Sequence, residues 1–153
     1  MRLFRTGRAG AVHLLGLVLA AAPAGAVPAT RYQPKTWSGG YSDRIVEPGL
    51  WRIDATANGR AELGFAQNMA AYRAADILRA AGFEYMQIVD QKGEYWSMSG
   101  MPAGGKATLW VRGAHDSAPP VDCRAKQSET CVTVPVARTM ERTRPLLRFP
   151  NGS

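Results

Sequence analysis

The sequence is poor in the side chains that build metal and redox centres. It holds two histidines and two cysteines, and of these only His115, Cys123 and Cys131 follow the first 26 residues. The residues flanking the two cysteines supply no further zinc ligands. Their spacing is also wider than the two-residue spacing typical of redox-active pairs. These shortages argue against a zinc site and against a dithiol catalyst.

Acidic residues and long apolar runs are both missing from the amino-terminal region. Residues 1–26 contain three arginines, no acid, an apolar run at 11–22 and small residues at 24–26. This layout is typical of a cleaved secretory signal peptide. The apolar run is too short for a bilayer core, which takes about 20 residues. No cysteine lies near Ala26, and a lipid-modified amino terminus needs one immediately after the cleavage site, so we do not expect that modification. We therefore predict a signal peptide at 1–26 and a bacterial protein that is periplasmic or secreted.

Motifs of catalysis and phosphate binding are missing as well. No serine occupies a G-x-S-x-G elbow, and Gly104-Gly105-Lys106 lacks the spacing of a phosphate-binding loop. His115 has Asp116 and Ser117 beside it, a set that occurs in almost any exported chain. The acids Asp43, Asp90 and Glu94 are far more often solvated than paired for catalysis. We predict that the protein is not an enzyme and has no cofactor, with a small hydrolase as the weaker alternative.

The positive charge of the chain belongs partly to its amino terminus. The formal charge is +7, and removal of the three leading arginines leaves 16 basic against 12 acidic residues, or +4. An exported protein without a basic face interleaved with aromatics is not expected to bind nucleic acid. The remaining cluster consists of Arg138, Arg142, Arg144 and Arg148. It reads as a solvated face, or alternatively as a peripheral contact with anionic lipid or polymer.

Cys123 and Cys131 predict a structural disulfide. They are the only cysteines of the exported chain and are separated by seven residues, RAKQSET. An even count at short spacing in an oxidising compartment usually means a bridge.

The nucleus of the predicted fold is a strand, a helix and a second strand, in that order along the chain. In WRIDATA, Trp51, Ile53 and Ala55 alternate with polar residues, as in a strand with one wet face. Residues 60–81 then show a helical period with a mostly small stripe, which favours close packing on a sheet. The stripe consists of Leu63, Ala66, Ala70, Ala74, Ile77, Leu78 and Ala81. Residues 83–90 predict a central strand covered on both sides.

The rest of the chain completes one α+β domain. Residues 40–43 predict a turn, 91–106 a loop or loose hairpin, and 108–112 a strand antiparallel to 83–90. Residues 132–142 suit either a last helix or an edge strand. The predicted fold is a small β-α-β-β sheet with one main helix and a short carboxy-terminal helix. Its parts are a signal peptide (1–26), an extended leader (27–40), the domain (41–148) and a tail (149–153).

Several short runs resemble a known family. They are GYSD at 40–43, Pro48-Gly49 with Trp51, RAAD at 73–76, Gly82-Phe83 and IVD at 88–90. Together they are similar to the CC0125/CC1285-type lipoprotein family of the bacterial cell envelope, whose function is unknown. The likeness covers residues 39–90. This chain departs from the family in lacking the lipobox cysteine. The resemblance implies an envelope location and no activity.

Two groups of side chains are candidate sites. Tyr95, Trp96 and Trp110 suggest an aromatic patch for an envelope protein or glycan partner. Met98 and Met101, with His115, form a ligand set suited to Cu(I), although methionines on such a segment more often fill gaps in packing. The preferred function is a non-catalytic binding or interaction module of the cell envelope, with a periplasmic soft-metal protein as the alternative.

Overall fold

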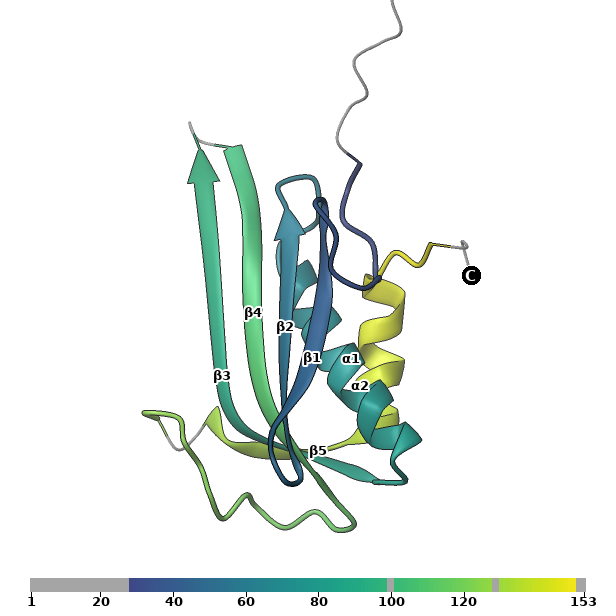
Figure 1. The fold of residues 1–153 in the computed structure, drawn as a ribbon, viewed down its shortest axis with the longest axis vertical. Coiled ribbons are helices and arrows are strands. Elements are labelled where there is room, and N and C mark those ends of the chain that lie inside the picture. Colours follow the sequence, from purple (N-terminus) through teal and green to yellow (C-terminus); the bar gives the residue numbers. More distant parts are fainter. Residues whose placement is uncertain (1–27, 99–100, 128–129, 151–153) are drawn as a thin grey trace, which may run out of the picture.

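The chain forms a five-stranded antiparallel sheet with two helices on one face (Figure 1). The computed structural model describes residues 28–98, 101–127 and 130–150, so the predicted signal peptide lies outside the described residues. In chain order the elements are β1 (Gly39–Glu47), β2 (Leu50–Asn58), α1 (Phe65–Ala80), β3 (Tyr85–Met98), β4 (Met101–Ala114), β5 (Val132–Pro135), α2 (Val136–Thr143) and the 3-10 turn η2 (Arg144–Leu146). The sheet order is β1-β2-β4-β3-β5. The predicted α+β class is confirmed.

The first two strands form a hairpin. The strand expected around WRIDATA is confirmed as β2, whose Ile53 and Ala55 are buried. The expected turn at residues 40–43 is wrong, because these residues belong to β1, which pairs with β2 along its whole length. Most of β1 is exposed and carries no apolar alternation. An edge strand of this kind is held by backbone pairing, so its side chains give no periodic signal.

β3 and β4 form a hairpin that is much longer than predicted. Each strand has 14 residues, and the register runs from Tyr85↔Ala114 to Met98↔Met101. The loop expected over 91–106 is therefore strand at 91–98 and 101–106, and the alternative of a hairpin is confirmed. Both β2 and β3 pair antiparallel with β4, so they run parallel to each other. β3 is covered by helices on one face only, which corrects the expected burial on both sides.

α1 packs on the sheet through small side chains. Ala66, Ala70 and Ala74 are at most 1% exposed, which confirms the middle of the predicted stripe, whereas Ala81 at its end is exposed. The helix begins at Phe65 rather than near residue 60, because Gly64 takes a left-handed conformation with φ of 84°. Leu63 therefore precedes the helix and is 85% exposed. Ala75, which is not part of the predicted stripe, is fully buried, so the buried face of α1 is wider than that stripe.

Residues 132–142 contain both of the structures that the sequence suggested. β5 is a short edge strand that pairs with β3 from Tyr85 to Ile88. α2 follows at once, with Pro135 at its N-cap position. The helix buries Val136 and Met140 and packs beside α1 (Figure 1).

Both ends of the described chain pack on α1. Tyr32 contacts Tyr41, Tyr72 and Phe149, with ring centroids 4.8 to 5.1 Å apart. We call these four residues the aromatic cluster. Burial raises the pKa of Tyr32, and its hydroxyl has no hydrogen-bond partner among the described residues. The packed domain therefore reaches into the expected leader and tail, whereas Trp37 is 79% exposed.

The second face of the sheet is open and polar. Arg52 and Thr108 both donate hydrogen bonds to Oδ1 of Asp54, at 2.8 Å from Arg52 Nη2 and 2.8 Å from Thr108 Oγ1. Burial by itself raises the pKa of Asp54, but these hydrogen bonds outweigh it and leave the pKa below its ordinary value. The open face is therefore held by cross-strand polar contacts rather than by a second layer.

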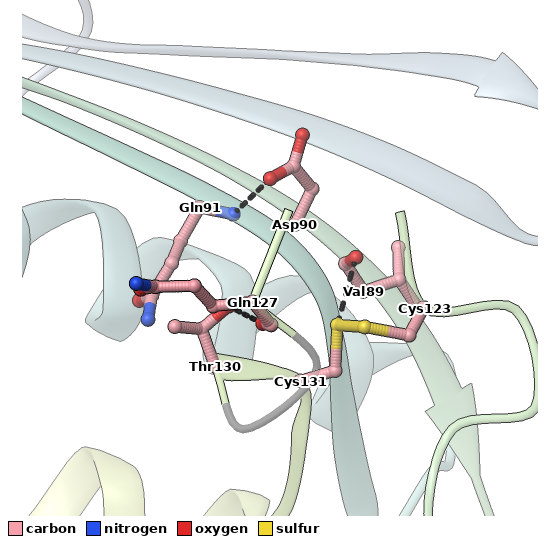
Figure 2. Close-up of a disulfide and its surroundings, with 7 residues drawn as sticks. All are labelled: Val89, Asp90, Gln91, Cys123, Gln127, Thr130 and Cys131. Atoms are coloured by element: carbon pink, nitrogen blue, oxygen red, sulfur yellow. Dashed lines mark hydrogen bonds between the residues drawn. A yellow bond between two sulfur atoms is a disulfide. The ribbon is translucent and has the colours of Figure 1, made fainter. Parts of the chain in front are cut away.

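The predicted disulfide is confirmed. Cys123 and Cys131 are joined, and Figure 2 shows the bridge beside Val89, where β3 carries a bulge. Cys131 Sγ lies 3.2 Å from the carbonyl oxygen of Val89, but an oxidised sulfur has no proton to donate, so this is a close contact. Arg124 donates its backbone N–H to the same oxygen and binds both carboxylate oxygens of Glu47. The disulfide loop is thus tied to two parts of the sheet.

Candidate functional site: an apolar cleft

An apolar cleft opens between the start of α1 and the far end of the β3–β4 hairpin. Its volume is about 460 Å³. The residues that give it its character are Asn58, Glu62, Leu63, Phe65, Tyr95 and Trp96. Leu63, Tyr95 and Trp96 are 85%, 53% and 39% exposed. Three large apolar side chains that remain in contact with water around one hollow are typical of a binding surface.

Two glycines in β4 make room for the aromatic wall of the cleft. Gly104 and Gly105 pair with Trp96 and Tyr95 across the hairpin. A Cβ at Gly105 would lie 3.3 Å from the Tyr95 ring, and one at Gly104 would lie 2.7 Å from the Trp96 ring. Gly104 also has a φ of +149°, which side-chain-bearing residues rarely adopt. Glycine at both positions lets the two rings lie against β4.

The loop before α1 supplies the opposite wall. Asn58 ends β2, and its side-chain oxygen accepts hydrogen bonds from the backbone N–H groups of Thr30 and Arg60. Gly64 turns the chain into the helix. Leu63 therefore lies before the helix and is exposed, whereas Phe65 is buried at the floor of the cleft. Leu63 was not expected at a site because it falls on the predicted helical stripe. Gly64, directly after it, was the signal that the helix begins later.

The predicted aromatic patch is only partly assembled. Tyr95 and Trp96 line the cleft, but Trp110 lies on the open face of the sheet. There its ring lies between Arg52 and Lys92, whose charged groups are each 5.2 Å from the ring centroid. Side chains alternate between the two faces of a strand, so Trp110 points away from its buried neighbours Leu109 and Val111. Trp110 lies six positions along β4 from Gly104, or about 20 Å at roughly 3.3 Å per residue, so it is not part of the cleft.

The proposed soft-metal set is not brought together. Met98 and Met101 oppose each other at one end of the hairpin. His115 follows the other end of β4, and 13 residues of strand at roughly 3.3 Å each put about 40 Å between it and Met101. The His115 ring contacts Phe83 instead, at 5.1 Å. The side chains of Met98 and Met101 lie outside the part of the chain whose side chains are described, so Cu(I) binding by this loop stays a prediction from the sequence.

The remaining candidate side chains do not converge either. Asp43 accepts a hydrogen bond from Arg73 at 2.9 Å, and Asp90 accepts one from the backbone N–H of Gln91. Asp43 lies in β1, whereas Asp90 and Glu94 lie in β3, three places away in the sheet. Within residues 28–98, 101–127 and 130–150, no group of three or more His, Cys, Asp or Glu side chains could hold a metal ion.

The four carboxy-terminal arginines have separate roles. Arg144 donates to the hydroxyl of Tyr72 and lies over the Phe149 ring, and Arg148 pairs with Glu62 at 3.2 Å. Arg138 and Arg142 are exposed on α2, beside a shallow groove. The predicted cluster is thus reduced to two free guanidinium groups in the described part of the chain.

Comparison with known proteins adds no relative. No family model, curated protein or solved structure matches the chain. The resemblance to the envelope lipoprotein family therefore stays a prediction. None of the helices described is both long and apolar enough to cross a membrane.

Proposed function

We propose that the protein is a non-catalytic binding module of the bacterial cell envelope, and that the apolar cleft is its binding site. The observation that carries this proposal is the exposure of Leu63, Tyr95 and Trp96 around one hollow of about 460 Å³. Leaving such side chains in water has a cost that burial in a partner removes. The cleft provides no cluster of titratable groups for acid–base chemistry.

The partner best suited to this cleft is a protein segment with large apolar side chains. Apart from Asn58, Glu62, the Tyr95 hydroxyl and the Trp96 indole N–H, the lining is apolar. A glycan needs several convergent hydrogen-bonding groups, but Asn58 and Glu62 already bind other residues, which leaves the Tyr95 hydroxyl and the Trp96 indole N–H. A leucine-sized or phenylalanine-sized side chain needs only apolar walls and a hollow of this volume. We therefore prefer a protein partner to a glycan.

Export supports a partner outside the cytoplasm. The disulfide is of the kind that persists in oxidising compartments, and residues 1–26 have the pattern of a cleaved signal peptide. The intact mass of the protein purified from the periplasm tests this part of the proposal. Cleavage after Ala26 leaves Val27 as the first residue, and an uncleaved chain would contradict it.

Selection of peptides tests the binding site. The exported protein, immobilised, is used to select from a random 12-residue peptide library, and we expect enrichment of large apolar residues. Replacement of Trp96 by alanine removes one wall of the cleft, which costs about 2 kcal/mol of binding free energy. The dissociation constant of the best peptide, measured by calorimetry, should therefore rise roughly 30-fold.

Trp37 offers a matched control. It is also an exposed tryptophan, but it lies outside the cleft lining. Trp37→Ala should leave the dissociation constant unchanged. Equal binding by wild type and Trp96→Ala, or selected peptides without apolar residues, would refute the cleft as the site.

A further inference from the structure

The outer edge of β3 is open along the far half of the hairpin. On this side β5 pairs with β3 only from Tyr85 to Ile88, and the N–H of Arg124 then takes the carbonyl of Val89. Among the described residues, no strand pairs with β3 beyond that point on this side (Figure 1). An open edge of this length presents unpaired backbone groups to another strand.

The backbone groups that face this edge can be assigned. The Val89 carbonyl points to the edge, since Arg124 lies there, and the N–H of Gln91 bonds to Oδ1 of Asp90 at 2.9 Å. Alternate residues of a strand direct their N–H and C=O groups to the same side. Gly93 and Tyr95 therefore also direct theirs toward the open edge.

The side chains along the edge are complementary to a second copy of themselves. Consider two β3 strands that pair antiparallel with Gly93 opposite Gly93. Lys92 of each chain then lies directly opposite Glu94 of the other, and Gln91 lies opposite Tyr95. All four of these side chains are exposed. Gly93 has no side chain at the symmetry axis, which leaves the centre free of steric conflict.

We propose that the open edge of β3 is a dimer interface, in which two copies pair antiparallel about Gly93. The ladder covers Gln91 to Tyr95 of each chain, because Arg124 and the disulfide loop close the edge at Val89. It provides two Lys92–Glu94 ion pairs and backbone hydrogen bonds at Gln91, Gly93 and Tyr95, with the Gln91 N–H exchanging Asp90 Oδ1 for the carbonyl of the other copy. The two sheets join into one of ten strands with all helices on the same face. This inference does not depend on the partner of the apolar cleft.

Charge reversal tests the proposed register. The full chain is expressed with its own amino-terminal segment, purified as the host processes it, and studied by sedimentation velocity over a range of concentrations. We expect a dimer whose dissociation constant rises at least tenfold in Lys92→Glu and in Glu94→Lys, since each variant puts like charges opposite each other twice. The double variant Lys92→Glu with Glu94→Lys restores the opposite-charge pairs and should dimerise again.

Lys106 supplies the matched control. It lies opposite Glu94 within the same hairpin and does not lie on the edge, so Lys106→Glu should leave the dissociation constant unchanged. Thermal unfolding verifies that every variant is folded. A wild-type protein that stays monomeric at the highest concentration, or a double variant that stays as weak as the single ones, would overturn the proposal.

Discussion

Loss of the Cys123–Cys131 bridge should destabilise the protein without rearranging its fold. The bridge spans eight positions in the sequence. In the chain-entropy treatment, closing a loop of about this size stabilises by about 2.5 kcal/mol. The native loop keeps other attachments when the bridge is cut, because Arg124 still bonds to Val89 and Glu47. The loss should therefore come mainly from the greater freedom of the unfolded chain.

Urea unfolding of the oxidised protein, the reduced protein and the variant Cys123→Ala with Cys131→Ala measures this effect. Reduction leaves both sulfur atoms in place, so only the covalent link changes. We expect both altered forms to lose about 2.5 kcal/mol of unfolding free energy, or roughly 10 °C in melting temperature. A loss below about 1 kcal/mol of unfolding free energy in both forms would refute the reasoning. The bridge would then not restrict the globally unfolded chain as the loop-closure treatment assumes.

Two further predictions concern the open face and the aromatic cluster. The pKa of Asp54 is lower in the folded state than in the unfolded state, where it is about 3.9. Its ionised carboxylate therefore stabilises the fold above that unfolded pKa, and this stabilisation is lost as the pH falls through the folded pKa. Asp54→Asn should therefore cost about 1 kcal/mol at pH 7 and reduce the fall in stability between pH 7 and pH 3, as followed by urea unfolding. Phe149→Ala removes a half-buried ring from the aromatic cluster and should cost about 2 kcal/mol, whereas Trp37→Ala should cost less than about 0.5 kcal/mol in the same melt.

The parts of the fold that the sequence predicted are those with a strong apolar period. Ile53 and Ala55 identified β2, and the alanines at 66, 70 and 74 identified the face of α1 that packs on the sheet. β1 was not predicted as a strand because backbone pairing holds a polar edge strand whatever its side chains are. The far half of the β3–β4 hairpin was not predicted as strand because its glycines are typical of a loop. In the structure, Gly104 and Gly105 instead give space to aromatic rings.

The candidate site was only half predictable for a related reason. Tyr95 and Trp96 were recognised by residue type, which requires no knowledge of the fold. Whether Trp110 joins them depends on which residues of β4 lie opposite Tyr95 and Trp96, and the sequence leaves that register open. Leu63 depends on where α1 begins, and helix boundaries are weakly specified when no side-chain cap marks them.

The cleft and the open edge follow from one mismatch in length. A helix rises roughly 1.5 Å per residue, so the 16 residues of α1 cover about 24 Å. The 14 residues of β3 at roughly 3.3 Å each extend over about 46 Å. α1 therefore cannot cover the whole hairpin, and the four-residue β5 cannot pair along its whole edge. The far end of the hairpin is left with an uncovered aromatic face and an unpaired backbone edge. Both are surfaces that another polypeptide can complete, which is why we place the function there.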